Sequence, residues 1–212
     1  MNIRESPKMK ILSKLATCAS MMFLSAAAHA NLITDGSFEI PAIANGSWTT
    51  ISNGSITNWV PGTYGIELRN NVAGTAFDGV QYVELDTTQN SFMSQTFATT
   101  AGQTYLFSFA YSPRPGVAAN SNEIDAYWNG VLVAALTADG TQNTNNVWSV
   151  YNFLEVASGS SSTIKFAANG TSNALGGSLD AVSVTAKVPE PATLALLGLG
   201  LLGFAAARRR KQ

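Results

Sequence analysis

The sequence predicts an all-β domain, an antiparallel β-sandwich or jelly roll, over residues 31–187. Short runs rich in β-branched and aromatic residues recur along this segment, and stripes of apolar residues with a helical period are absent. Its length suits one ordinary domain with its own core. Turn-forming pairs separate the runs, at Asp35-Gly36, Asn45-Gly46, Asn53-Gly54, Asp78-Gly79, Asn129-Gly130, Asp139-Gly140 and Asn169-Gly170.

The clearest predicted strand covers residues 103–112, because its aromatic residues recur with the period of two that a half-buried strand requires. Residues 122–128 and 131–136 flank Asn129-Gly130, the favoured pair for a two-residue turn, and are predicted to form a hairpin. Further strands are predicted at 80–86, 92–97, 147–156, 162–168 and 178–186. Eight or more short antiparallel strands in one small domain indicate a sandwich or jelly roll.

Residues 1–30 have the pattern of a secretory signal peptide. Four cations precede an apolar run from Leu15 to Ala28, and Ala28-His29-Ala30 supplies the small-x-small pattern that signal peptidase needs. Met1 and Met9 are alternative starts. The only cysteine, Cys18, and the only histidine, His29, both lie in this segment. The exported domain is therefore expected to contain no disulfide, thiol nucleophile or imidazole.

The predicted domain is acidic. Residues 31–187 contain eleven acidic residues and four basic ones, which leaves a net charge of −7. Binding to phosphate groups requires clustered cations, so this balance argues against a nucleic-acid partner. An acidic surface is typical of a protein that must stay dispersed outside the cell.

Without histidine or cysteine, paired carboxylates are the remaining route to catalysis. Glu84 with Asp86, and Glu123 with Asp125, are each two residues apart on a predicted strand, about 7 Å between Cα atoms. This spacing overlaps the carboxylate separation that glycosidases use. The alternative is that each pair marks the wet face of its strand, since Val83 and Leu85 alternate with Glu84 and Asp86.

Asp180 is the acid whose position calls for a partner. It has the same parity as Val182 and Val184, so we expect it to point inward, where a carboxylate needs compensation. Glu39 could meet it if the first and last strands lie together, and a calcium ion would then offset their repulsion. Alternatively, Asp180 caps a turn at the edge of its strand.

NLITDGSFE near the start of the domain and GGSLDAVSV near its end resemble the opening and closing motifs of galactose-binding-like jelly-roll domains. Many carbohydrate-binding modules belong to this superfamily. The resemblance implies that Glu39 and Asp180 help to bind a structural calcium ion, together with backbone carbonyls. DGVQYVELD, SQTFATTAGQTYLFSFAYSPRPG and SNEIDAYWNG are similar to a subgroup of exported bacterial proteins with this fold and interchangeable C-terminal anchors.

Several residues could contact a sugar ligand. Trp48 and Trp59 lie in connections rich in glycine and asparagine and are the better candidates for stacking on a sugar ring. Arg114, held between two prolines, could bind a carboxylated sugar or pair with an acid such as Glu123. The full set of predicted ligand-binding residues is Trp48, Trp59, Tyr82, Glu84, Asp86 and Arg114.

The C-terminal segment, residues 188–212, has three parts. Pro189-Glu190-Pro191 is followed by sixteen small or apolar residues, 192–207, and then by four cations. As a helix the apolar part would be about 24 Å long, close to a membrane span, with the cations on the cytoplasmic side. This order resembles the PEP-CTERM sorting signal of exopolysaccharide-producing Gram-negative bacteria. The resemblance implies recognition by an exosortase and cleavage near the triplet.

The sequence therefore predicts a non-catalytic protein of the cell surface or extracellular matrix. Signal peptidase and an exosortase process it, its C-terminal helix anchors it transiently in the inner membrane, and its calcium-stabilised jelly roll associates with exopolysaccharide. The alternatives are a glycosidase or lyase that uses its carboxylate pairs, and a passive structural matrix protein.

Overall fold

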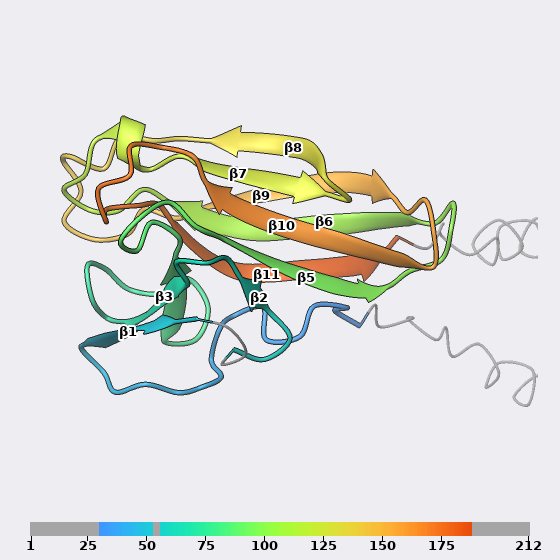
Figure 1. The fold of residues 1–212 in the computed structure, drawn as a ribbon, viewed down its shortest axis with the longest axis horizontal. Coiled ribbons are helices and arrows are strands. Elements are labelled where there is room, and N and C mark those ends of the chain that lie inside the picture. The colour runs from blue at the N-terminus through green and yellow to red at the C-terminus, as the bar shows by residue number, and fades with distance from the viewer. Residues whose placement is uncertain (1–29, 53–55, 188–212) are drawn as a thin grey trace, which may run out of the picture.

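The computed structural model describes residues 30–52 and 56–187, so most of the predicted signal peptide and the whole C-terminal segment lie outside it. Eleven strands and one short 3-10 helix make up the regular structure of the described residues (Figure 1). In chain order these are β1 (Ser47–Ile51), β2 (Val60–Pro61), β3 (Ile66–Asn70), β4 (Gln81–Glu84), β5 (Phe92–Ala98), β6 (Thr104–Ser112), η1 (Ala119–Ser121), β7 (Ile124–Trp128), β8 (Val131–Leu136), β9 (Ser149–Val156), β10 (Ser161–Ala168) and β11 (Ser178–Ala186).

The strands form two antiparallel sheets, which confirms the predicted sandwich. Sheet A has the order β1-β3-β4-β11-β6-β9, and sheet B has the order β2-β5-β10-β7-β8. Each strand faces the other sheet with its apolar side chains, because side chains alternate between the two faces. Phe107 and Phe109 of β6 meet Phe166 of β10 at the centre of the core. The core cluster of the described residues runs from Ile33 to Val184 and draws on both sheets.

The predicted strands occur at β4 to β11, with small differences at their ends. The Asn129-Gly130 turn joins β7 to β8, and both residues have positive φ, +49° and +82°, as the predicted two-residue turn requires. The sequence did not predict β1, β2 and β3. β2 has two residues, and the charged Glu67 and Arg69 of β3 hide its apolar alternation.

The two ends of the described chain lie together. The N–H of Leu32 donates to the carbonyl of Val184, and the N–H of Val182 donates to the carbonyl of Gly36. A Cβ on Gly36 would lie 1.9 Å from the carbonyl oxygen of Val182, so only glycine allows this approach. The N-terminal segment thus runs beside β11.

The described ends and the long connecting loops lie at opposite ends of the sandwich (Figure 1). The N–H of Lys187 donates to the carbonyl of Thr104, the first residue of β6. Ser112, the last residue of β6, is opposite Ser178 of β11, which is opposite Glu84 of β4 on its other side. The nine residues of β6 separate these two ends by about 27 Å.

None of the helical residues in the described ranges forms a helix long and apolar enough to cross a membrane. The predicted membrane helix at 192–207 lies outside those ranges.

Candidate functional site

The loop at residues 77–81 holds the two carboxylates that the sequence predicts to share a site. Oδ2 of Asp180 accepts the N–H groups of Phe77 and Asp78, at 2.7 and 2.9 Å. Oε1 of Glu39 accepts the N–H groups of Val80 and Gln81, at 2.8 and 2.9 Å. The two acids, from opposite ends of the domain, therefore bind adjacent parts of one short loop.

Gly79, between these two amide pairs, is required by the geometry of the loop. Its φ is +69°, a conformation that side chains with a Cβ rarely adopt. A Cβ at this position would also lie 2.2 Å from Oε1 of Glu39. Glycine is thus what lets the loop close on the Glu39 carboxylate.

Asp180 is buried, as predicted, but the predicted parity is wrong. β11 contains a β-bulge between Asp180 and Ser183, with Ala181 at a positive φ of 48°. Asp180 is opposite Ala110 and lies on the outer face of sheet A, whereas Leu179 and Val184 face the core. The loop at 77–81 covers it, and burial raises the pKa of Asp180 to about 7 against the lowering effect of its backbone hydrogen bonds.

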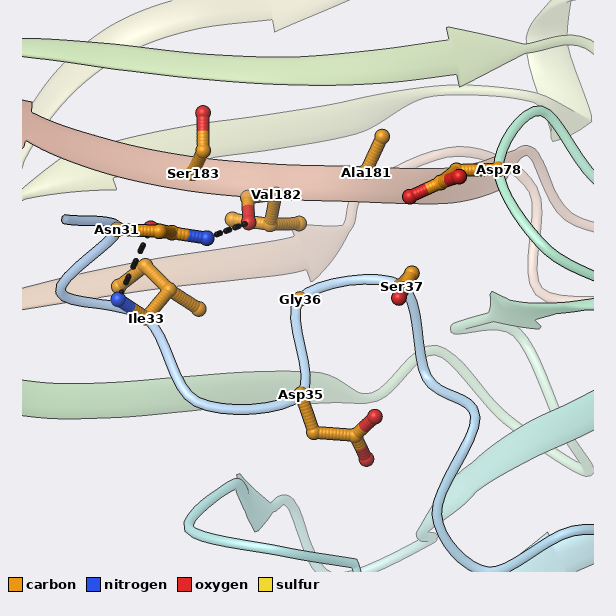
Figure 2. Close-up of a pocket in the computed structure, with 9 residues that line it drawn as sticks. All are labelled: Asn31, Ile33, Asp35, Gly36, Ser37, Asp78, Ala181, Val182 and Ser183. Carbon is orange, nitrogen blue, oxygen red and sulfur yellow. Dashed lines mark hydrogen bonds between the residues drawn. The ribbon is translucent and has the colours of Figure 1, made fainter. Parts of the chain in front are cut away.

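A shallow hollow of about 290 Å³ lies beside this loop, between the N-terminal segment and β11 (Figure 2). Asp35 and Asp78 line it, together with Asn31 and Ser183. Oδ1 of Asp35 accepts the N–H of Glu39 at 2.8 Å, and its buried Oδ2 has no partner within the described ranges. Burial raises the pKa of Asp35 as well.

Carboxylates such as those of Glu39 and Asp180 are ligands that a hard cation takes, but in the described residues they accept backbone N–H groups, including that of Ala181 on Oδ1 of Asp180. Calcium takes six to eight oxygen ligands, and carboxylates are among those it prefers. Within the described ranges no three Asp, Glu, His or Cys side chains form a metal-binding group, so carbonyl oxygens or water would have to complete the shell. All three ion pairs of the described residues involve Glu67 or Glu84, which leaves Asp180 buried without a compensating cation.

Glu84 and Asp86 are fully buried, so the wet-face interpretation of this pair is wrong. Nη1 of Arg114 donates to both carboxylate oxygens of Glu84, at 2.8 and 2.9 Å. The N–H of Gly176 also donates to Glu84, and Nη2 of Arg69 lies 3.1 Å from its Oε2. Burial raises the pKa of Glu84 to about 7, against the lowering effects of Arg69 and Arg114.

Asp86 anchors the loop that leads into β11. Its Oδ2 accepts the N–H groups of Asn173 and Leu175, at 2.9 and 3.3 Å, and its Oδ1 accepts the hydroxyl of Ser172. Both oxygens of Asp86, like both oxygens of Glu84, are therefore engaged by the protein itself. This arrangement positions loops and leaves neither carboxylate free to act on a substrate.

Arg114 forms an ion pair with Glu84. The sequence left open whether Arg114 binds a carboxylated sugar or pairs with an acid such as Glu123; the structure shows a pairing with an acid, and that acid is Glu84. Arg114 also donates to the carbonyl of Ala174, so it connects the end of β6 to the loop before β11. Glu67 and Arg69, which the sequence did not single out, extend the network along β3.

The second carboxylate pair is bridged by an amide. Nδ2 of Asn169 donates to Glu123 and to Asp125, at 3.3 and 3.1 Å. The hydroxyl of Tyr127 donates to Asp125 at 3.0 Å. Asp125 is 6 % exposed, which places it beneath the surface rather than on a wet face.

A strip of aromatic residues crosses the outer face of sheet A. Trp48 of β1 is opposite Arg69 of β3, which is opposite Tyr82 of β4. Directly opposed residues share a face, so all three lie on one side of the sheet. The ring of Trp148 meets the buried ring of Tyr82 edge-on at 5.8 Å between centroids, and Phe77 continues the strip.

Only part of this strip is accessible. Trp48 is 54 % exposed and Phe77 is 49 % exposed, whereas Tyr82 lies beneath Trp148. Asn145 and Trp148 both hydrogen-bond to Thr75, which joins the loops on either side of the strip. Trp148 is also one of the large aromatic residues that the sequence offers for stacking on a sugar ring, and it follows a run of asparagine and threonine at 143–146.

Trp59 is not a ligand residue, which corrects the prediction. It is 2 % exposed and packs against Phe38 and Phe166 in the core. Its Nε1 donates to the carbonyl of Asp35 at 3.1 Å. The glycine and asparagine residues around Trp59 belong to a surface loop, but the side chain of Trp59 itself enters the core.

The family model of the PEP-CTERM protein-sorting motif matches residues 187–211. This match includes Pro189, Glu190 and Pro191, which lie outside the described residues. No curated protein matches the chain.

Solved structures similar to this chain include three β-domains. The native structure of a family 35 carbohydrate binding module from Clostridium thermocellum has 14% sequence identity and a TM-score of 0.44, and the likeness covers 65% of this chain and 97% of that one. TmCBM61 in complex with β-1,4-galactotriose has 14% identity and a TM-score of 0.47, over 74% and 99% of the two chains. The K1 cleaved adhesin domain of Lys-gingipain from Porphyromonas gingivalis W83 has 12% identity and a TM-score of 0.48, over 68% and 98%.

The sequence match and the sheets together define the organisation of the chain. In this chain an antiparallel β-sandwich, in which loop amides or arginines bind the carboxylates of Glu39, Glu84, Asp86 and Asp180, is followed directly by a PEP-CTERM protein-sorting motif.

Proposed function

We propose that this chain is an exported, non-catalytic protein of the cell surface or extracellular matrix, sorted by an exosortase, whose sandwich binds exopolysaccharide. The sorting motif at residues 187–211 supports the first part, because its apolar and cationic segments suit a transient anchor in the inner membrane. Signal peptidase would remove residues 1–30, and the exosortase would cut near Pro189-Glu190-Pro191. The mature domain would then be released from the membrane.

The observation that carries polysaccharide binding is the exposed part of the aromatic strip on sheet A, formed by Trp48 and Phe77. Trp48 presents a flat apolar ring, and the amide side chains of Asn45 and Asn71 hydrogen-bond to each other in the two loops next to β1 and β3. A ring flanked by directional polar groups suits a sugar, whose faces are apolar and whose edges carry hydroxyls. The buried Glu84 and its partly buried partner Arg114 hold the sheet and loops beneath this surface.

Two further elements belong to the proposal. A structural calcium ion, held by Glu39 and Asp180, would supply the charge that buried Asp180 lacks. In this proposal the loop end of the sandwich, toward which the strip lies, would face away from the membrane anchor, because residue 187 lies at the opposite end of β6.

Binding is tested with residues 31–187 and the exopolysaccharide of the host. Trp48→Ala is expected to weaken binding about tenfold, because losing the aromatic contact and its buried area costs more than about 1 kcal/mol of binding free energy. Phe92→Ala, which removes a partly exposed ring from sheet B, is the matched control. Equal binding by the parent and Trp48→Ala, or none by the parent, would contradict the proposed site.

Sorting is tested separately in cells. Replacement of Pro189, Glu190 and Pro191 by alanine is expected to keep the chain at its uncut mass in the membrane fraction. Release of the same cut product from this variant would show that the triplet does not direct processing. This result is independent of whether the sandwich binds sugar.

A further inference from the structure

One side of the sandwich carries uncovered strand edges. β9 ends the order of sheet A and β8 ends the order of sheet B, so each has only one strand neighbour among the described residues. Exposed apolar side chains gather there: Val131 and Leu132 on β8, and Val150, Leu154 and Val156 on β9. Glu155 is the one charged residue in the two strands, although the domain as a whole is acidic.

β9 is the regular edge of this side. It pairs with β6 over eight consecutive residues without a register shift, whereas β8 has a shift beside Val133. A bulge of this kind twists an edge away from new partners, and β2 at the far edge of sheet B has only two residues. The eight residues of β9 include no proline and no lysine, the usual means of blocking an edge.

The backbone groups that β9 presents at its open edge can be identified from the hydrogen bonds of β6, the strand beside it. The carbonyl of Thr104 accepts from Lys187, on the β11 side of β6. Because successive residues alternate, Tyr105 and Phe107 direct their backbone groups toward β9 and bond with Glu155 and Phe153, their opposed residues. The open edge of β9 therefore presents the N–H and C=O groups of Val150, Asn152, Leu154 and Val156.

This edge is complementary to itself. If two copies meet antiparallel with Asn152 on the two-fold axis, Val150 lies opposite Leu154 of the partner subunit. Both of these side chains are exposed on the outer face, at 50 % and 56 %. Glu155 then lies opposite the partner's Ser149, so the two charges of the interface are kept apart. Neither copy meets a repulsive group, and each gains a row of backbone hydrogen bonds.

We propose that two copies of this chain associate through β9, which joins their six-stranded sheets into one continuous antiparallel sheet. The contact is isologous, since the same strand serves both copies, and it closes after two subunits. The edge formed by β1, which carries Trp48, remains free at each end of the joined sheet.

A single cysteine tests the contact directly, because residues 31–187 contain none. Hydrogen-bonded residues opposite each other in an antiparallel pair have Cα atoms about 5.5 Å apart, within the range of a disulfide. Mild oxidation of Asn152→Cys is expected to convert most of the protein to a covalent dimer. Val60→Cys, exposed on the edge strand of sheet B, is the matched control and is expected to stay largely monomeric.

Association of the cysteine-free protein is measured by sedimentation across a dilution series. Leu154→Lys is expected to raise the dissociation constant at least about tenfold, because it removes two apolar contacts per dimer. Val131→Lys, on β8, is expected to leave that constant unchanged. A protein that is monomeric throughout, a dimer insensitive to Leu154→Lys, or equal cross-linking at residues 60 and 152 would overturn the proposal.

Discussion

Lowering the pH is expected to stabilise the domain in the presence of a chelator, and Asp180 supplies a large part of the effect. Burial raises its pKa from 3.8 to about 7. Between these two values the folded protein holds a proton that the unfolded chain has released. The stabilisation is thus fully present below about pH 3.8 and is lost as the pH rises through about 7. About three pH units at 1.36 kcal/mol per unit amount to about 4 kcal/mol.

Asp180→Asn isolates this contribution, because Glu84 titrates in the same direction. The asparagine oxygen can still accept the N–H groups of Phe77 and Asp78, and the side chain does not ionise. Urea unfolding at a series of pH values gives the free energy of unfolding for both proteins. The difference between parent and variant is expected to change by about 4 kcal/mol across the titration. A difference that stays constant with pH would refute the assignment to Asp180.

Calcium is expected to reverse this dependence. A bound cation favours the ionised carboxylate and lowers the pKa of Asp180, so the stabilisation by calcium is lost as the pH falls through that lowered pKa. Unfolding curves with calcium and with chelator should separate near neutral pH and converge in acid, and Asp180→Asn should reduce the separation. Coincident curves near neutral pH would contradict the proposed calcium site. They would not affect the pH dependence expected of the protein in chelator.

Two substitutions test how the loops are held. Gly79→Ala is expected to lower the free energy of unfolding by more than about 1 kcal/mol, because the alanine would have to adopt a positive φ and its Cβ would clash with Glu39. Gly102→Ala is the control: its φ is similar and no atom lies within 4 Å of the new Cβ, so it measures the conformational cost alone. Equal losses in urea unfolding would show that the contact does not matter. Arg114→Ala is expected to cost about 3 kcal/mol at pH 8, because Glu84 would lose a buried partner, and less at pH 5, where Glu84 can protonate. An identical loss at both pH values would mean that charge pairing is not the cause.

The strands were predictable where a local pattern decides them. β6 shows regular alternation and β8 follows an Asn-Gly turn, and both occur as predicted. β3 was missed because both of its faces are buried: Leu68 faces the core, while Glu67 and Arg69 lie on the outer face beneath loops. Alternation predicts which side a residue faces but not whether a loop later covers that side.

The candidate site shows the same limit. The meeting of Glu39 and Asp180 at one loop follows the expected pairing of the two ends of the domain. The parity of Asp180 was wrong because a single extra residue, Ala181, changes the alternation. The burial of Glu84 depends on Arg114, which lies thirty residues away in the chain, and no local pattern reports such a contact.

The proximity of the two described ends has a consequence for how the domain bears mechanical load. Leu32 bonds to Val184 by its backbone, so a force that pulls residues 31 and 187 apart acts first on the N-terminal segment and β11. It peels this short contact bond by bond instead of shearing the long β6–β9 and β6–β11 pairings together. A chain held at one end by a matrix and at the other by a membrane would therefore yield at its own terminus while most of the sandwich stayed intact.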